Sequence, residues 1–141
     1  MRLRYLLDTN VISDPTRREP DPGIRARLDE YGAESALASV VWHEMWFGVS
    51  RLPDSRRKRD LQDYLVTVVE PSFPILPYDE AAAQWHAEER ARLGAVGWVS
   101  SFTDGQIAAV AHVHGLVLVT ANLSHFERFD HLETTDWRER R

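Results

Sequence analysis

Three acidic residues lie where a carboxylate is costly or lacks a nearby partner. Asp8 directly follows the apolar run Tyr5–Leu7. Burying an unpaired carboxylate there would cost several kcal/mol, so we expect it to face a cleft, a cation or a hydrogen-bond donor. Glu44 lies among apolar and aromatic residues, with no Arg or Lys three or four positions away. Asp104 precedes the small apolar run Ile107–Ala111.

These acids could do chemistry together if the fold brings them to one place. Converging carboxylates repel one another, and their pKa values rise unless a cation lies between them. Oxygen ligands without cysteine favour a hard cation, Mg²⁺ or Mn²⁺. Such a cation activates water and stabilises the oxygens of a phosphoryl displacement, which points to phosphodiester hydrolysis. Each acid also has an ordinary interpretation: Asp8 and Asp104 could serve as helix caps or complement a helix dipole.

Glu44 is the hardest of the three to explain as a purely structural residue. It lies on a predicted helix that also carries Val41, Met45 and Val49 on one face. Gly48, one turn further on, leaves the space beside the carboxylate open, at a cost to the helix of up to about 1 kcal/mol relative to Ala. We interpret this opening as room for something to approach the acid.

The elements that must position these acids alternate between strands and helices, which predicts an α/β fold with a central, mostly parallel sheet. We expect strands at 5–7, 35–38, 75–76 and 116–120, with a short final strand near the C-terminus at best. We expect helices at 21–31, from Ser39 as the cap, from Asp54 as the cap, at 79–93 and from Asp104 to 114, with a loop at 94–101. Right-handed crossovers put the loops after Leu7 and Val119 on the same edge of the sheet.

Size and composition fit one globular domain over residues 1–141. The chain has no cysteine, which excludes disulfides and thiolate sites, and no apolar run long enough to span a membrane, so we expect it in the cytoplasm. A net charge of -5 gives no general attraction to nucleic acid. The local basic stretch from Arg51 to Arg59 fits either a solvated helix face or contact with phosphates.

The motifs, taken in order from about Leu6 to Trp137, resemble the PIN domain, and most closely the VapC-type toxins of prokaryotic toxin–antitoxin pairs. They are Leu6–Asn10, Glu44–Gly48, Asp104 with Ile107–Ala111, and Gly115–Asn122. The resemblance implies a PIN-like α/β/α sandwich and a Mg²⁺- or Mn²⁺-dependent endoribonuclease that acts on RNA. It also implies a cognate VapB-type antitoxin and a homodimer. Trp42, Trp46 and Trp85 have the spacing of core or interface residues.

The resemblance also implies roles for particular residues. Asp8, Glu44 and Asp104 match the metal-binding, catalytic acids of the family, and Thr9, Thr120 and Asn122 match its polar residues around the site. The last motif departs from the family pattern: Ala121 replaces an arginine, and His125 replaces an acid that is often the fourth of the site. Glu127 and Asp130 are nearby acids that could substitute, but neither is in register.

Two other classes of protein, one enzyme and one phosphorylation module, begin at a strand-end aspartate and fit poorly. Aspartyl-phosphate phosphatases need a second aspartate two residues on, where this chain has Asn10. A receiver module needs a lysine near the last strands, whereas the only lysine is Lys58. The alternative that stays open is a PIN-like module that binds RNA or a partner and has weak or no catalysis because of His125. For the toxin, we expect the antitoxin to cover the cleft between Asp8 and Glu44.

Overall fold

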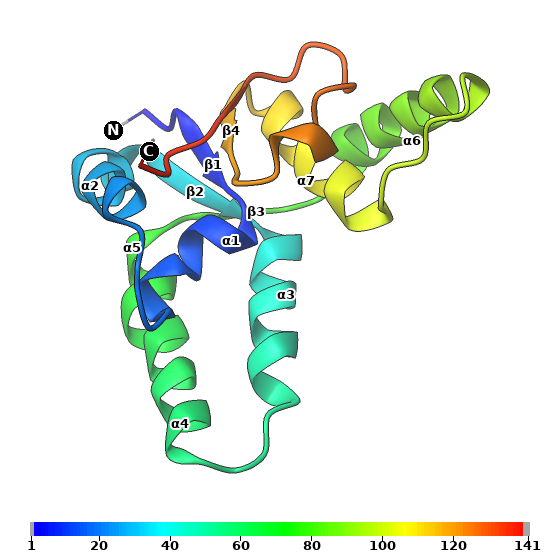
Figure 1. Cartoon of the computed structure of the whole chain (residues 1–141). Helices are drawn as coiled ribbons and strands as arrows, with labels where there is room; N and C mark the ends of the chain where they lie inside the picture. Colours follow the sequence, from blue (N-terminus) through cyan, green and yellow to red (C-terminus); the bar gives the residue numbers. More distant parts are fainter. Residues whose placement is uncertain (1, 140–141) are drawn as a thin grey trace.

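The computed structural model describes residues 2–139, so residues 1, 140 and 141 of the expected single domain lie outside the description. Five strands form one sheet in the order β3-β2-β1-β4-β5, and every neighbouring pair is parallel. The strands are β1 (Tyr5–Leu7), β2 (Ser35–Ala38), β3 (Ile75–Leu76), β4 (Val117–Val119) and β5 (Thr134–Thr135). Helices flank the sheet (Figure 1), so the predicted α/β architecture with a parallel sheet is confirmed.

The helical segments alternate with these strands along the chain. They are α1 (Thr9–Ile12), η1 (Asp14–Thr16), α2 (Pro22–Tyr31), η2 (Gly32–Glu34), α3 (Ser39–Ser50), α4 (Arg56–Asp63), the π-helical turn η3 (Tyr64–Val69), α5 (Glu70–Ser72), α6 (Glu80–Ala95), α7 (Phe102–Val113) and η4 (Leu123–His125). Helix α7 packs against β2 and β4, and α6 packs on α7. Ile107 to Ala111 of α7 are all buried, so the small apolar run is the face that meets the core.

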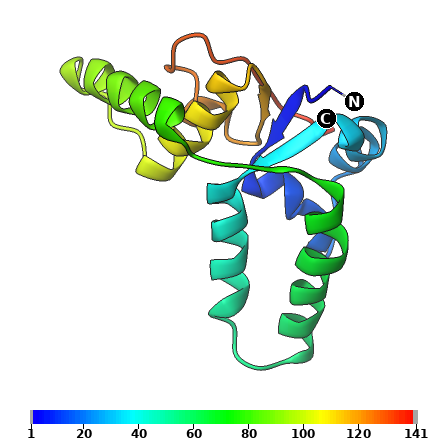
Figure 2. The ribbon, with the colours of Figure 1, turned by 180° about the vertical axis from the view of Figure 1, so that it is seen from behind.

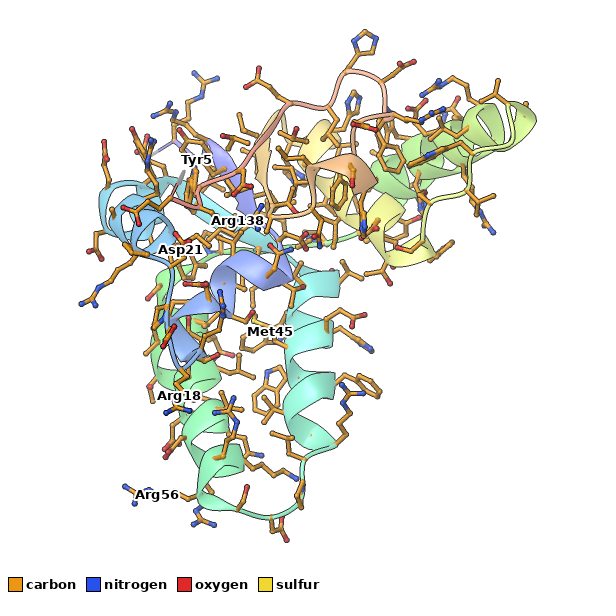
Figure 3. The ribbon with its side chains drawn as sticks, viewed as in Figure 1. Tyr5, Arg18, Asp21, Met45, Arg56 and Arg138 are labelled. Carbon is orange, nitrogen blue, oxygen red and sulfur yellow. The ribbon has the colours of Figure 1, made fainter. Side chains whose placement is uncertain are left out.

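Helices α3 and α4 run side by side as a hairpin that projects away from the sheet, as both ribbon views show (Figures 1 and 2). Met45 and Val49 of α3 are buried, and Met45 points toward the α4 side of the hairpin (Figure 3). The Tyr64 hydroxyl donates to the Ile12 carbonyl at 2.6 Å, and burial raises the pKa of this tyrosine to about 12. The hairpin is thereby attached to α1, the helix that follows Asp8.

Several helix starts differ from the expected ones by one to three residues. Ser39 is the first residue of α3 and makes no cap, while Ser55 rather than Asp54 caps α4 by accepting from the Lys58 amide. Helix α6 continues to Ala95, into the expected loop. Helix α7 begins at Phe102 with Ser101 as its cap, which makes Asp104 the third residue of the helix. Serine hydroxyls compete well with carboxylates for helix N-termini, and composition alone does not separate neighbouring candidates.

Strand register explains where the sheet presents polar groups. Leu7 pairs with Val119 at the ends of the central neighbours β1 and β4. The residue that follows each of these strands is polar, so Asp8 and Thr120 lie next to each other at the carboxyl edge of the sheet. In open α/β sheets this edge is where ligands bind.

Candidate active site

Asp8 stands at the carboxyl end of β1 and is 7% exposed. Its Oδ1 accepts a hydrogen bond from the Thr9 amide at 2.7 Å, and its Oδ2 accepts one from the Thr120 hydroxyl at 2.8 Å. The cap interpretation of Asp8 is therefore correct in part, because the carboxylate does bind the first turn of α1. The bond from Thr120 holds the second oxygen in place across the β1–β4 pair.

The electrostatic surroundings of Asp8 place Asp104 close to it. Burial is the main cause that raises the pKa of Asp8, while the bonds from Thr120 and Thr9 lower it. The negative charge of Asp104 raises the pKa of Asp8 further. A cation bound beside Asp8 would stabilise the ionised form of this buried carboxylate.

Asp104 lies in the first turn of α7, where its amide donates to the Ser101 hydroxyl at 3.0 Å. One carboxylate oxygen, Oδ2, lies 3.3 Å from Nδ1 of His125. His125 is the last residue of η4, which follows β4, and its side chain is about half exposed. The structure thus brings Asp8, Asp104 and His125 together, although they are far apart in the sequence.

Glu44 lies beside this group rather than within it. Its side chain is half-buried on α3 and lines two grooves. One groove, of about 210 Å³, also contains Thr9, the neighbour of Asp8. The other, of about 400 Å³, also contains Thr103 and Gln106, which flank Asp104. Glu44 therefore stands between the Asp8 side and the Asp104 side of the carboxyl edge.

The donor set suits a hard divalent cation, although the acids do not form a closed cage. Among residues 2–139, no three His, Asp or Glu side chains gather closely enough to hold a metal ion by themselves. Mg²⁺ is nevertheless commonly held by one or two carboxylates, with water and substrate phosphates completing its coordination. The neighbouring carboxylates of Asp8, which is buried, and Asp104 fit that pattern, and Glu44 adds a third acid at the border.

The predicted accessory residues act mostly through their backbone or on Asp8. Thr9 offers its amide, and the Thr120 hydroxyl both donates to Asp8 and accepts from the Asn122 amide at 3.0 Å. Asn10 was not among the expected site residues, yet its side-chain oxygen accepts from the Ala121 amide at 3.2 Å. This bond ties the loop after β1 to the loop after β4. The Asp-Thr-Asn run in the sequence was the available signal for it.

The suggested substitutes for a fourth acid do not gather with Asp8 and Asp104. Asp130 has its carboxylate 3.4 Å from Arg92 Nε, and its amide donates to Glu89 at 2.7 Å. Asp130 is thus bound to α6, and Glu127 is exposed in the same segment. Instead of an acid, His125 contacts Asp104 from this segment.

The fold and this site define a small α/β domain with an acidic centre at the carboxyl edge of a parallel sheet. The PIN domain family matches residues 5–132 of the chain. VapC ribonuclease Y4jK of Sinorhizobium fredii is 34% identical over 86% of this chain and 89% of that protein. Toxin FitB of Neisseria gonorrhoeae is 34% identical over 94% of this chain and 97% of that protein. The solved structure of FitAB bound to an IR36 DNA fragment contains a chain with a TM-score of 0.88 and 31% identity, covering 97% of this chain and 98% of that one.

The chain therefore belongs to the PIN-domain family, within its VapC-type branch. This confirms the resemblance that the four motifs indicated. Over residues 2–139, the structure has no helix of the length and apolar character needed to cross a bilayer.

Proposed function

We propose that this protein is a Mg²⁺- or Mn²⁺-dependent endoribonuclease that acts as the toxin of a toxin–antitoxin pair in the cytoplasm. The observation that carries the proposal is the placement of two acids close together at the sheet edge, with the buried carboxylate of Asp8 near the charge of Asp104. The names of the relatives, a VapC ribonuclease and a toxin, support the same activity.

The roles of the residues follow from their contacts. Asp8 and Asp104 would hold the cation, with Glu44 as a third acid from α3. A bound divalent cation supplies an activated water and stabilises the charge that develops on the phosphodiester oxygens. Thr120 orients Asp8 by its 2.8 Å bond, and the Thr9 amide keeps the other oxygen in place. Because these bonds exist before any ligand binds, the carboxylate needs little reorganisation.

Cleavage of single-stranded RNA by the purified protein, with added Mg²⁺, Mn²⁺ or EDTA, tests the proposal. We expect metal-dependent cleavage, and a loss of at least about 100-fold in Asp8→Asn or Asp104→Asn, the order seen when one preorganised electrostatic group is removed from an active site. Asp29→Asn, an exposed residue of α2, is the matched control. RNA binding without metal-dependent cleavage in the wild-type protein would instead favour the binding module.

The groove between α1, α3 and α4 is the surface we assign to the antitoxin. Apolar side chains of α3, α4 and η3 line it: Met45, Val49, Leu61 and Leu65. Thr9 and Glu44 also line this groove, so a segment bound there lies next to the acids. An amphipathic segment can place its apolar residues in such a groove, and an arginine on it would pair with the carboxylates. Inhibition would then result from covering the site.

We also propose that the protein forms a homodimer. The expected interface tryptophans, Trp42, Trp46 and Trp85, are half-buried and pack against the core of this chain. Large apolar side chains that are exposed instead include Phe47 on α3 and Val96, Val99 and Phe102 near the α6–α7 connection. Light scattering of the wild-type protein and of Val99→Asp tests this assignment: a dimer that becomes a monomer supports it, and a monomeric wild-type protein contradicts it.

A further inference from the structure

Helix α6 contributes none of the acids, yet it supports the turn that carries Asp104. His86 of α6 is 2% exposed, and its Nδ1 lies 2.8 Å from the hydroxyl of Tyr78. Burial lowers the pKa of His86 and raises that of Tyr78, so the imidazole is neutral and the phenol keeps its proton. The phenol therefore donates to Nδ1, and the ring proton lies on Nε2. The ring is held in one orientation with its Nε2 side toward α7.

The residue that meets this ring is Gly105, which directly follows Asp104. A Cβ at position 105 would lie 2.5 Å from Cδ2 of His86 and would also overlap Nε2. Real Cβ atoms do not approach that closely, so the contact between α6 and α7 requires a glycine here. Glycine weakens a helix relative to alanine. The glycine therefore lowers the stability of α7 at the position directly after Asp104, a proposed metal-binding acid.

Phe102 completes the contact from the first residue of α7. Its ring lies 4.8 Å from the His86 ring, centroid to centroid, and the Arg90 guanidinium lies 5.3 Å from its centroid. The three side chains form a cluster that joins α6 to the first turn of α7. Asp104 lies between the two residues of α7, Phe102 and Gly105, that touch His86.

We propose that His86 is a positioning residue: with Gly105 as its matching gap, it sets where Asp104 stands relative to Asp8. This inference rests on the proposed function, because the separation of the two acids matters only if they act on one cation. A change of about 1 Å in such a site can cost on the order of 100-fold in activity. The His86 ring fills the space left by the missing side chain of Gly105. The effect of adding a methyl group at position 105 should therefore be reduced by removing the ring at position 86.

Four proteins test the match: wild type, Gly105→Ala, His86→Ala and the double variant. The readouts are the Mn²⁺ dissociation constant from calorimetry, the melting temperature, and RNA cleavage. Gly94→Ala is the matched control, since it is a helical glycine of α6 with nothing within 4 Å of an added Cβ. We expect it to bind Mn²⁺ like the wild type.

We expect Gly105→Ala to weaken Mn²⁺ binding by about tenfold or more, as its methyl group pushes the first turn of α7 away from His86. His86→Ala should weaken binding less, and the double variant should bind more tightly than either single one. Such non-additivity is the mark of two residues in direct contact. Packing alone would give the same pattern in the melting temperature but not in Mn²⁺ affinity.

Additive effects on Mn²⁺ affinity, or wild-type affinity in Gly105→Ala, would overturn the proposal. If Gly105→Ala does not fold, the comparison is between His86→Ala and the double variant, and weaker or equal binding by the double variant overturns it. If the wild type itself neither binds Mn²⁺ nor cleaves RNA, the proposed function has failed. The positioning role is then read from a crystal structure of Gly105→Ala or, if that variant does not fold, of His86→Ala. A shift in the Asp8–Asp104 separation of about 0.5 Å or more supports it, and an unchanged separation overturns it.

Discussion

His125 Nδ1 lies 3.3 Å from Oδ2 of Asp104, across the gap between η4 and the first turn of α7. The family resemblance led us to expect an acid at this position, and an imidazole brings no negative charge to it. His125 therefore contacts a proposed metal-binding acid without adding to the charge that attracts a cation. Imidazole is a better ligand for transition metals such as Mn²⁺ than for Mg²⁺.

The substitution His125→Asp should lower the Mg²⁺ concentration needed for half-maximal RNA cleavage several-fold, because it adds a carboxylate beside Asp104. Because the wild-type imidazole suits Mn²⁺ better than Mg²⁺, we expect the wild-type protein to be more active with Mn²⁺ than with Mg²⁺. Titrations of the cleavage rate with Mg²⁺ and with Mn²⁺ measure both effects. His131→Asp, at an exposed position, makes the same charge change elsewhere on the surface. Superimposable Mg²⁺ curves for wild type and His125→Asp would exclude His125 from the metal site.

Asp8→Asn should make the metal-free protein more stable at neutral pH while it abolishes cleavage. Burial and the charge of Asp104 raise the pKa of Asp8 in the folded state. The ionised form is then less stable in the fold than in the unfolded chain, and a neutral amide removes that cost. About 1 kcal/mol would raise the melting temperature of a domain of this size by roughly 3 °C.

The pH dependence of this difference has a defined sign. As the pH falls through the raised pKa, wild-type Asp8 becomes protonated and resembles Asn, so the advantage of Asp8→Asn should shrink. Thermal melts in EDTA at several pH values measure it. A variant that is less stable than wild type at neutral pH would show that the hydrogen bonds from Thr9 and Thr120 outweigh desolvation.

His86 should make the fold sensitive to acid. Burial lowers its pKa below the ordinary value of 6.5, so the folded protein keeps it neutral while the unfolded chain takes up a proton. Stability should therefore fall as the pH drops through 6.5, by at most about 1.4 kcal/mol per pH unit for one group. Denaturant melts of wild type and His86→Gln between pH 5 and pH 7 compare the two slopes. Equal slopes would mean that other groups dominate acid sensitivity.

Leu61→Glu should weaken binding of the antitoxin by about 100-fold, because it replaces an apolar side chain of the groove with a charge. A loss of this size is typical when an anchoring residue of an interface is changed. Leu61 lines the groove between the hairpin helices together with the apolar side chains of Met45, Val49 and Leu65. Val66→Glu, on an exposed position of η3, is the control. The measurement is the affinity of each variant for the co-expressed cognate antitoxin. Unchanged affinity in Leu61→Glu would place the antitoxin elsewhere.

Local patterns in the sequence were enough to predict the framework of the site. Short apolar runs bounded by glycine, proline and polar residues indicated the strands, and their alternation with helices indicated a parallel sheet, as the structure confirms. Because parallel strands end at one edge, the loops after Leu7 and Val119 were expected on the same edge of the sheet. The structure adds that β1 and β4 are neighbours in register, which puts the Thr120 hydroxyl within reach of Asp8.

Contacts between distant segments could not be predicted in the same way. His125 reaches Asp104 because the turn of η4 directs its side chain back toward α7, and Glu44 lies beside the acids because of the angle at which α3 leaves the sheet. Each of these depends on helix rotation and packing, which no pattern within the segment encodes. The sequence pattern likewise did not decide between the neighbouring residues Asp54 and Ser55 as the cap of α4, which is Ser55 in the structure.

The pair of His86 and Gly105 shows the division most clearly. The sequence by itself determined that both residues lie on helices, and that Gly105 follows an acid of interest. Only the tertiary structure decided that the imidazole of one fills the space left by the missing side chain of the other. Strands and helices follow from the period of nearby residues, whereas the fit of two surfaces depends on atoms brought together by the whole fold.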